Sequence, residues 1–436
     1  MPGARGIAEI DSLARRAHVL NRDRRIDRDA IYGLKLEALE RLWTRARLHD
    51  DDGFERYEAE QGAVLQDYAT FCALAEEYGC GRHGWPADVR HPRAPGIARV
   101  LRRPRTRDRV RFHKWVQYQL DRQLARAAAV LPVMQDLPIG FDADGADAWS
   151  FQDVLAQGIS VGAPPDEFNT RGQNWGLPPF VPNLLRADGY EPFIQTIRAS
   201  LRHAAGLRID HVMGLFRLFW IPAGKEPAAG AYVRLPSDDL LAIVALESQR
   251  ARAVIVGEDL GTVEEATRHA LAEKLILSYR LVWFEKRPPS TFPELSLSAI
   301  TTHDLPTVAG LWSGSDLEAQ RQLQLAPNEA GTQEIQDRIA KMTKAVRRTP
   351  ASTVIARLHA QLATAPSRLL TATLEDAEGV EERPNMPATT NQWPNWSIAL
   401  PMPIERLKRS KLARAIARAL NRNQRPPVPA RRQRRA

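Results

Sequence analysis

Three short apolar runs of the sequence, each with the pattern of a buried β-strand, close on an acidic residue: Asp210, Glu258 and Asp304. The acids are separated by 48 and 46 residues, which leaves room for one or two strand–helix units in each interval. In a parallel α/β barrel the carboxyl ends of all strands meet at one rim, where such folds keep their chemistry. The spacing therefore predicts that the three carboxylates lie at the C-terminal rim of a barrel.

Such a trio of carboxylates is compatible with two kinds of chemistry. In the first, three carboxylates at strand ends bind Mg²⁺ and a lysine or histidine acts as the base. In the second, one carboxylate attacks a sugar while another donates a proton across the glycosidic bond, with the pair about 5–5.5 Å apart in retaining enzymes. A third interpretation is purely structural, because acids at strand ends also serve as caps and surface salt bridges.

The neighbouring residues favour glycosidic chemistry over a metal site. Arg208 lies two residues before Asp210, hence on the same face of a strand, where its cation would favour an ionised nucleophile. His303 precedes Asp304 and adds a donor for sugar hydroxyls. A metal site would gain nothing from a guanidinium so close to one of its ligands.

A segment rich in glycine and proline could supply a sugar-binding surface. The stretch Phe168–Phe180, FNTRGQNWGLPPF, reads as a loop that carries the flat ring of Trp175 and the amides of Gln173 and Asn174. Sugars present apolar C–H faces and hydroxyl rims, so one ring and several amides suit a glucan chain. The alternative is a buried tryptophan that anchors the loop.

The elements that must position these residues are six candidate strands, alternating with helical or loop segments in the rhythm of βα units. They are Val133–Phe141, Gly206–His211, Arg252–Gly261, Leu275–Phe284, Leu297–Asp304 and Arg368–Asp376. This pattern predicts an α/β fold of the (β/α)₈-barrel type. Because a closed barrel has eight strands, we expect it to be incomplete at its N-terminal side.

The chain ahead of these strands is helical in pattern. Apolar residues recur every four positions at Phe112, Val116, Leu120 and Leu124, and Leu36, Leu39 and Trp43 also keep helical spacing. We expect an N-terminal extension at 1–28, a helical subdomain at 29–131, a catalytic barrel portion at 132–405 and a basic tail at 406–436.

Charge and cysteine content limit the classes of protein further. The chain has a formal net charge of +9, but the tail alone carries twelve Lys and Arg and no acid, so the rest is near −3. The tail is predicted to be a short helix, Lys411–Asn421, followed by a disordered segment, and it lacks the interleaved aromatics of a nucleic-acid-binding arm. Two cysteines, Cys72 and Cys80, and no long apolar run predict a cytoplasmic protein without disulfides.

Five motifs, in chain order, resemble those of a known family. They are RGQNWGLPP, LRIDHVMGLFRLFWIPAG, VIVGEDLGTV, TTHDLPTVAGLW and RPNMPATTNQWPNW. The sequence is similar to the 4-α-glucanotransferases of the α-amylase clan, also called amylomaltases or disproportionating enzymes, and in particular to the bacterial type with a large helical insertion. The resemblance covers roughly Ile31 to Leu400.

The resemblance implies a role for each matched residue. Asp210 would be the nucleophile that forms a β-glucosyl-enzyme, Glu258 the general acid and then the general base, and Asp304 the group that holds the 2- and 3-hydroxyls of the distorted sugar. The residues implied in substrate binding are Arg208, His303, Trp175, Gln173 and Asn385. The implied substrates are maltooligosaccharides and linear α-1,4-glucans, with no metal or organic cofactor.

The sequence departs from the family pattern in two places. Ala388 stands where the family usually has glycine, and the family's first two barrel strands have no counterpart before Ile31. The expectations left open are an N-terminally truncated and inactive or merely glucan-binding relative, an α-glucan hydrolase with the same carboxylates, and a chain completed by an oligomeric or second partner.

Overall fold

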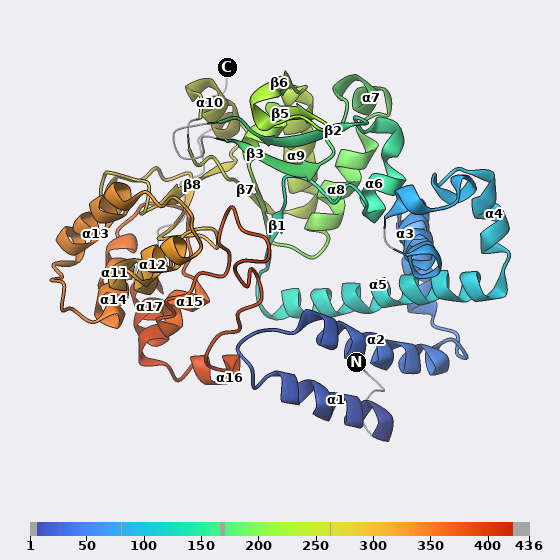
Figure 1. Cartoon of the computed structure of the whole chain (residues 1–436), viewed down its shortest axis with the longest axis horizontal. Coiled ribbons are helices and arrows are strands. Elements are labelled where there is room, and N and C mark those ends of the chain that lie inside the picture. Colours follow the sequence, from blue (N-terminus) through green and yellow to red (C-terminus); the bar gives the residue numbers. More distant parts are fainter. Residues whose placement is uncertain (1–6, 80, 166–170, 262, 422–436) are drawn as a thin grey trace, which may run out of the picture. The chain divides into compact units, whose positions relative to one another are not determined.

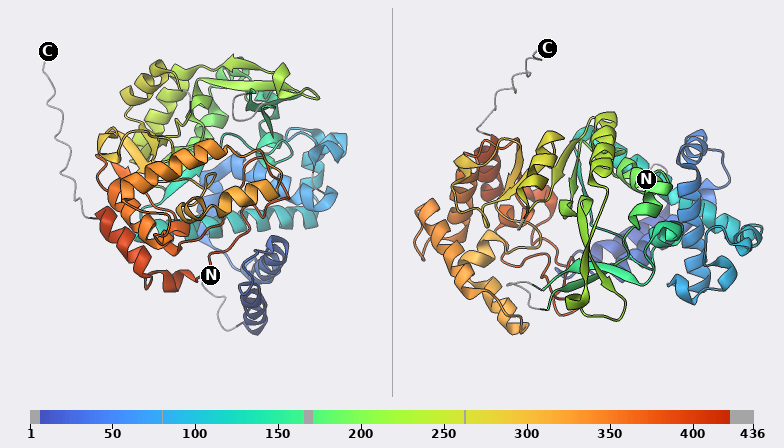
Figure 2. Two further views of the ribbon diagram at one scale, coloured as in Figure 1. Left: turned by 60° about the vertical axis from the view of Figure 1, so that its left-hand side comes forward. Right: turned by 90° about the horizontal axis from the view of Figure 1, so that it is seen from above.

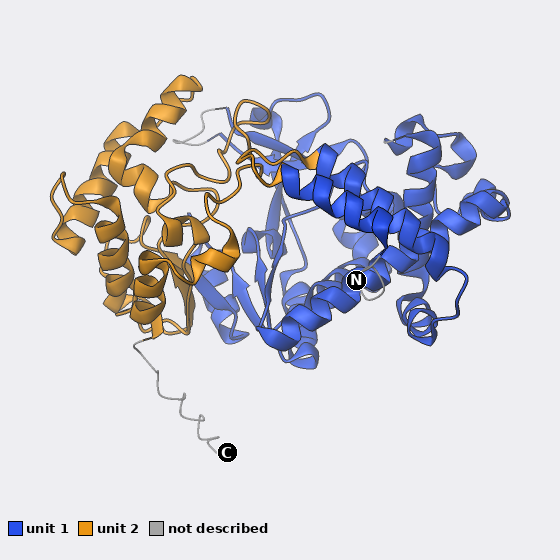
Figure 3. Cartoon of the chain, turned by 90° about the horizontal axis from the view of Figure 1, so that it is seen from below, with its two compact units in different colours: residues 1–19, 29–278 blue, residues 20–28, 279–436 orange. Residues whose placement is uncertain are grey.

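The computed structural model describes residues 7–79, 81–165, 171–261 and 263–421, and these form two compact units. Unit 1 comprises Met1–Val19 and Asp29–Ser278, and unit 2 comprises Leu20–Arg28 and Tyr279–Ala436 (Figure 3). The division falls inside one strand, β8 (Leu277–Leu281). Cys80 and the end of the basic tail lie outside the described residues, and no described helix is long and apolar enough to cross a membrane.

Among the described residues, five α-helices precede the first strand, and Figure 1 labels each of them. They are α1 (Ala8–Leu20), α2 (Arg28–Ala46), α3 (Asp52–Tyr78), α4 (Pro95–Leu101) and α5 (Pro104–Val130). The Asp51 carboxylate accepts from two free N–H groups at the start of α3, and Pro104 opens α5 where no N–H is needed. Aromatic side chains of α2, α3 and α5 form one buried cluster: Trp43, Phe54, Phe112, Trp115 and Tyr118.

The predicted four-residue repeat along α5 is only partly a buried face. Phe112 is buried, whereas Leu120 is 52% exposed. A strict spacing of four drifts around a helix of 3.6 residues per turn, so the later members leave the packed face.

Parallel strands form the centre of unit 1. In strand order they are β1 (Met134–Leu137), β4 (Gly206–Ile209), β7 (Val254–Gly257) and the start of β8. The helices after β1 are α6 (Ala146–Ser150), α7 (Pro182–Ala187), α8 (Glu191–Leu201), α9 (Ser237–Ala251) and α10 (Glu265–Glu273). Leucine, isoleucine and valine side chains from α8, α9, β4 and β7 share one core, which buries the Leu207 and Ile209 face of β4.

A second sheet in unit 1 was not predicted from the sequence. It is antiparallel, with the strand order β3 (Gln173–Leu177), β2 (Ile159–Ala163), β5 (Arg217–Pro222) and β6 (Ala231–Arg234) (Figure 2). Gly162 lies within β2 and Gly176 within β3, and the glycine and proline content of Phe168–Phe180 gave the part around β3 the composition of a loop. Gly162 is required by packing, because a Cβ there would lie 2.0 Å from the carbonyl oxygen of Gln173.

Unit 2 continues the strand order as β8, β9 (Ser296–Ala299) and β10 (Leu369–Leu370). Its helices are α11 (Val308–Ser313), α12 (Ser315–Gln322), α13 (Glu329–Thr343), α14 (Ala351–Leu362), α15 (Leu374–Glu378), α16 (Ile404–Leu407) and α17 (Lys411–Asn421). Helix α17 is present as predicted, and its Ile416 is buried in the core around α14. The segment 20–28 joins this unit through Arg25, which bridges to Ile398.

All six predicted strands are present, as β1, β4, β7, β8, β9 and β10. The strand pairs whose register is determined among these are parallel. Within the described residues the order therefore holds six strands where a closed (β/α)₈ barrel has eight. The predicted fold class, an incomplete barrel of this type with helical parts, is confirmed by the structural comparison reported below.

One buried carboxyl in unit 2 supports the segment that leads from β9 into α11. Asp376 of α15 is 1% exposed, and its Oδ1 accepts from the backbone N–H of Val308 at 3.0 Å. No described group donates to its Oδ2. Burial raises the pKa of Asp376 from 3.8 to about 7.

We predict that Asp376 makes unit 2 less stable as the pH rises from about 4 to 7. The folded chain holds the Asp376 proton up to pH 7, whereas the unfolded chain releases it near pH 4, so stability is fully present below pH 4 and falls across this window. Urea unfolding at pH 5 and pH 7.5 should show Asp376→Asn removing about 2.5 kcal/mol of this pH dependence. Asp337→Asn, at an exposed position of α13, is the control, and equal pH dependence in both variants would contradict the prediction.

Candidate active site

The strand register of unit 1 places Asp210 and Glu258 at neighbouring strand ends. Ile209 of β4 pairs with Gly257 of β7, and each of the two acids is the next residue along its strand. The ladder continues past both ends, because Asp210 N donates to Leu137 O at 2.9 Å and Glu258 N donates to Ile209 O at 2.9 Å. The two carboxylates therefore leave the same edge of the parallel strands, as predicted for a barrel rim.

Glu258 is held by backbone groups of the two adjacent turns. Its Oε2 accepts from His211 N at 2.9 Å and its Oε1 from Leu260 N at 2.8 Å. Burial nevertheless raises the pKa of Glu258, with a further contribution from the charge of Asp210; the two hydrogen bonds and Arg208 act in the opposite direction. The result is a fixed carboxyl that takes up a proton more readily than an ordinary glutamate.

Asp210 stands in a different environment, beside a guanidinium. Arg208 Nη2 lies 2.9 Å from Asp210 Oδ1, and the Asp210 side chain is 36% exposed. Arg208 Nη1 also donates to Asp136 Oδ1 at 2.6 Å. Two carboxylates thus share one cation.

Asp136 was not predicted as part of the site. It lies on β1, where the strand register pairs it directly with Arg208. The signal in the sequence is an acid inside an apolar strand candidate, where a charge requires a partner. Because the pairing of strands was unknown, nothing in the sequence named that partner.

A strained turn brings the His211 amide to Glu258. His211 has φ 46° and ψ 60°, the left-handed conformation that costs a residue other than glycine about 1–2 kcal/mol. The following residue, Val212, packs on Gly257, where a Cβ would lie 2.9 Å from Val212 Cγ2. Gly257 therefore has to lack a side chain for the turn after β4 to close over Glu258.

Trp175 and Gln173 lie on a strand, and the prediction of a loop for Phe168–Phe180 is wrong over its described part. Gln173–Leu177 forms β3, which pairs with β2, and residues 168–170 lie outside the described residues. Trp175 Nε1 donates to Gln173 Oε1 at 2.9 Å, and the indole meets the His211 ring edge to face at 5.8 Å between centroids. Both predicted side chains are thus connected, through His211, to the turn that holds Glu258.

Asp304 lies in a loop, and its prediction as a strand-end residue is wrong. Strand β9 stops at Ala299, and a turn closed by a hydrogen bond from Leu305 N to Thr302 O, 3.3 Å long, carries Asp304 beyond it. A proline at 306 cannot donate to a neighbouring strand, which limits the length of the strand. Side chains rather than a strand ladder therefore have to orient this carboxylate.

Two predicted residues surround Asp304 in unit 2. Asn385 Nδ2 donates to Asp304 Oδ1 at 2.7 Å, and His303 Nε2 lies 3.2 Å from Asp304 Oδ2. The ring of Trp396, which was not predicted, lies 5.0 Å from that of His303 between centroids and is 49% exposed. The predicted site residues thus form one connected group in each unit. Unit 1 holds Arg208, Asp210, Glu258, Gln173 and Trp175, and unit 2 holds His303, Asp304 and Asn385.

Among the described residues, no three Asp, Glu, His or Cys side chains gather closely enough to hold a metal ion. A cavity of about 260 Å³ adjoins Asp210 and His211 within unit 1, and its walls are mostly leucine, isoleucine and phenylalanine side chains. Burial also lowers the pKa of the His211 imidazole. The site in unit 1 is therefore built from hydrogen bonds and ion pairs against an apolar wall.

The fold and these acids define a class of protein, the α/β-barrel type with carboxylates at the carboxyl ends of its parallel strands. A family model described as 4-alpha-glucanotransferase matches residues 7–404. The chain belongs to the 4-alpha-glucanotransferase family, as its five motifs predicted.

Individual relatives support the assignment to the family. The chain is 41% identical over 430 residues to the 4-alpha-glucanotransferases of Mycobacterium tuberculosis and Mycobacterium bovis, an alignment that covers 91% of this chain and 59% of theirs. It is 33% identical to that of Haemophilus influenzae, over 87% of this chain and 60% of the relative. The chain thus spans less than two thirds of the length of these relatives.

Solved structures agree in fold. The amylomaltase from Corynebacterium glutamicum matches with a TM-score of 0.83 and 30% sequence identity, covering 96% of this chain and 63% of that one. The amylomaltase from Streptococcus agalactiae, solved in complex with acarbose, matches with a TM-score of 0.76 over 91% of this chain and 80% of that one. At 19% identity, the second match bears on the fold alone.

The departure at Ala388 coincides with a conformation that favours glycine. Ala388 has φ 65°, and it is the third residue of a turn that begins at Met386, whose carbonyl accepts from Thr389 N at 3.3 Å. Pro387 occupies the second position, and a turn with proline second and a positive φ third is of type II, which takes glycine at that place. The alanine Cβ is therefore strained in a turn that begins one residue after Asn385.

We predict that Ala388→Gly stabilises the chain by about 0.5–1 kcal/mol, because relief of roughly 1–2 kcal/mol of strain exceeds the added flexibility of the unfolded chain. The measurement is the urea midpoint of unfolding. Ala326→Gly is the control, since Ala326 is an exposed loop residue outside the left-handed region and should lose stability. A loss of similar size at both positions would show that Ala388 carries no strain.

Proposed function

We propose that this chain is a retaining 4-α-glucanotransferase that moves α-1,4-glucan segments between maltooligosaccharides. The observation that carries the proposal is the pair of unequal carboxylates at the ends of β4 and β7. Asp210 is ion-paired with Arg208, whereas Glu258 is half-buried, accepts only from backbone N–H groups and has a raised pKa. A carboxylate beside a cation, next to a carboxyl that takes up a proton more readily than an ordinary glutamate, is the arrangement that a nucleophile and a general acid require. Membership of the family adds the substrate class.

The proposed reaction proceeds in two displacements. Asp210 attacks the anomeric carbon of the donor while Glu258 gives its proton to the departing 4-oxygen, so the glycosidic bond is exchanged for an ester to Asp210. The shortened glucan leaves, and a second glucan brings its 4-hydroxyl to the same carbon. Glu258, now ionised, takes the proton of that hydroxyl as the new bond forms and the ester breaks. The anomeric configuration is retained because it is inverted twice.

The other predicted residues support these steps in the proposal. Arg208 holds Asp210 in place and stabilises its charge when the ester breaks. Asp304, oriented by Asn385 and His303, accepts hydrogen bonds from sugar hydroxyls and balances positive charge that develops on the ring. Trp175 offers its ring and Gln173 its amide to the glucan. No metal or organic cofactor is part of the proposed mechanism.

Transfer differs from hydrolysis only in which hydroxyl reaches the intermediate. A bound sugar that holds the acceptor position excludes water and adds the advantage of proximity, so chain exchange dominates. An α-glucan hydrolase would use the same carboxylates and release glucose without longer products. The ratio of chain elongation to glucose release therefore separates the two functions.

We predict that the purified chain, incubated with maltotriose without added metal, produces a ladder of longer oligomers together with glucose. Asp210→Ala and Glu258→Gln should each reduce the rate of transfer at least about a thousandfold without loss of folding. The control is Asp239→Asn on α9. This variant removes the ion pair of Asp239 with Arg186 of α7 and should keep most of the activity. Chromatography of the products is the measurement.

Each alternative outcome has its own meaning. Glucose without longer oligomers would replace transfer by hydrolysis. A folded chain that binds maltotriose without turnover would make it a glucan-binding relative. Retention of most activity in either acid variant would remove the role assigned to that residue.

We also predict the direction in which Arg208 shifts the pH profile. Glu258 has to be protonated for the first displacement, so the transfer rate falls as the pH rises through the pKa of Glu258. Because this pKa is raised, the alkaline limb lies at a higher pH than the ordinary glutamate pKa of about 4.3. Because the charge of Arg208 lowers this pKa, Arg208→Gln should move the alkaline limb to higher pH while it reduces the rate. Arg186→Gln, on α7, should leave the limb in place. A limb that does not move, or moves to lower pH, in Arg208→Gln would contradict the assignment of Glu258 as the acid.

A further inference from the structure

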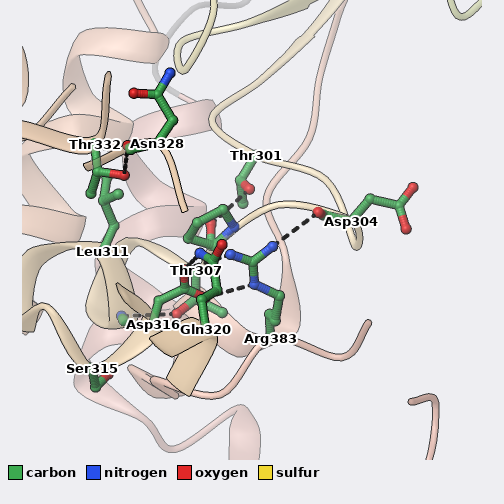
Figure 4. Close-up of polar contacts among 12 residues, drawn as sticks. Thr301, Asp304, Thr307, Leu311, Ser315, Asp316, Gln320, Asn328, Thr332 and Arg383 are labelled. Carbon is green, nitrogen blue, oxygen red and sulfur yellow. Dashed lines mark hydrogen bonds and ion pairs between the residues drawn. The ribbon is translucent and has the colours of Figure 1, made fainter. Parts of the chain in front are cut away.

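One guanidinium in unit 2 contacts both a buried acid and the main chain of Asp304 (Figure 4). Arg383 Nε donates to Asp316 Oδ1 at 2.6 Å, and its Nη2 donates to Asp316 Oδ2. The third nitrogen, Nη1, donates to the carbonyl oxygen of Asp304 at 3.3 Å. Arg383 is 5% exposed and Asp316 is 7% exposed. The guanidinium therefore uses all three nitrogens in fixed directions, two toward α12 and one toward the Asp304 loop.

Neither partner of this ion pair is free to move. Gln320, one turn further along α12, donates from Nε2 to Asp316 Oδ2 at 2.8 Å. The main chain of Arg383 is fixed as well, because its carbonyl accepts from Trp393 Nε1 at 3.1 Å. A buried arginine and aspartate with this fork geometry hold each other in one orientation, and either one alone would be an uncompensated buried charge.

Contacts within the loop that carries Asp304 close its turn. Asp304 N donates to Thr302 Oγ1 at 3.2 Å, and Thr301 Oγ1 donates to Pro306 O at 2.9 Å. From outside the loop, Trp283 Nε1 donates to Pro306 O at 3.1 Å, two residues beyond Asp304. The contact from Arg383 links the turn to a buried ion pair on a separate helix.

The same short segment also reaches the side chain of Asp304. Asn385, two residues after Arg383, donates to Asp304 Oδ1 at 2.7 Å. Residues 383–385 thus hold Asp304 at two points, at the main-chain carbonyl through Arg383 and at the carboxylate through Asn385. One contact holds the main-chain carbonyl of Asp304 and the other holds its carboxylate, so together they restrict the orientation of the side chain relative to the main chain.

We infer that Arg383, locked by Asp316, is a positioning residue that sets the direction of the Asp304 carboxylate. Arg383 itself contacts only the main chain of Asp304 and is not a catalytic residue. Its effect on the reaction rests on the proposed function, in which Asp304 meets the sugar hydroxyls; its effect on the geometry of the loop does not.

Lysine is the informative substitution at this position. It keeps the positive charge that Asp316 requires, but its single ammonium group cannot reach both carboxylate oxygens and the Asp304 carbonyl together. The matched control is Arg357→Lys, because Arg357 Nη1 also donates to main-chain carbonyls of unit 2, those of Thr343 and Lys344 at 3.2 and 3.3 Å. Both variants lose a contact from a guanidinium to a main-chain carbonyl, but only Arg383→Lys loses the contact at Asp304 and the fork to Asp316.

The first experiment measures kcat and KM for transfer from maltotriose, well below the melting temperature of each variant. Arg383→Lys should lower kcat at least tenfold with KM changed less than threefold, while Arg357→Lys changes neither by more than twofold. In an Asp304→Asn background, Arg383→Lys should lower kcat by less than twofold, because the carboxylate it positions is already lost. Equal tenfold effects in both backgrounds, or an unchanged kcat in Arg383→Lys, would overturn the inference.

The second experiment follows hydrogen exchange of the peptide that contains residues 300–308, and it needs no activity. Exchange of this peptide should be at least fivefold faster in Arg383→Lys than in the unchanged chain or in Arg357→Lys. If the unchanged chain transfers no glucan, the proposed function fails, and faster exchange still supports the positioning role. Exchange equal in all three proteins would overturn the inference whatever the activity.

Discussion

The register between β4 and β7 is the constraint on which the site in unit 1 depends. It pairs Ile209 with Gly257, and the next residue on each strand is one of the two acids. The strand ends are so close that Gly257 has no room for a side chain beside Val212. A slip of one residue in either strand would turn its acid toward the opposite face, into the apolar core, and separate the two carboxylates. The sheet thus determines which two carboxylates are neighbours before any side chain contributes.

What the sheet does not determine is how the two acids differ, and their hydrogen-bond partners do that. Glu258 receives neutral backbone N–H groups in a half-buried place, whereas Asp210 receives a full positive charge near solvent. Backbone dipoles only partly offset the cost of burying a charge, so the pKa of Glu258 stays above that of an ordinary glutamate. The difference depends on the left-handed turn at His211, which aims an amide at one acid and carries the chain away from the other.

The sequence was most informative where a residue acts through its position along a strand. All six parallel strands could be predicted, and Arg208 lies on the same side as Asp210 because side chains alternate along β4. It was least informative where the structure depends on pairing between distant segments. Asp136 was missed because the sequence of one strand does not show which strand lies beside it. Strand β3 was missed because Gly172, Gly176 and the two prolines after Leu177 give its segment the composition of a loop, and its pairing with β2 is not visible in the sequence.

Asp304 shows why an acid at the end of an apolar run is not always positioned by a strand. Its loop begins after Ala299, so no ladder of backbone hydrogen bonds reaches it, and its carboxylate depends on Asn385 and His303. A strand end tolerates substitutions around it because backbone bonds hold it, whereas a loop held by side chains loses its geometry when one of them changes. The turn at Ala388 follows within three residues of Asn385, so strain there is placed next to one of those side chains. The carboxylates of unit 1 are therefore positioned by the pairing of strands, and the carboxylate of unit 2 by the identity of the side chains around it.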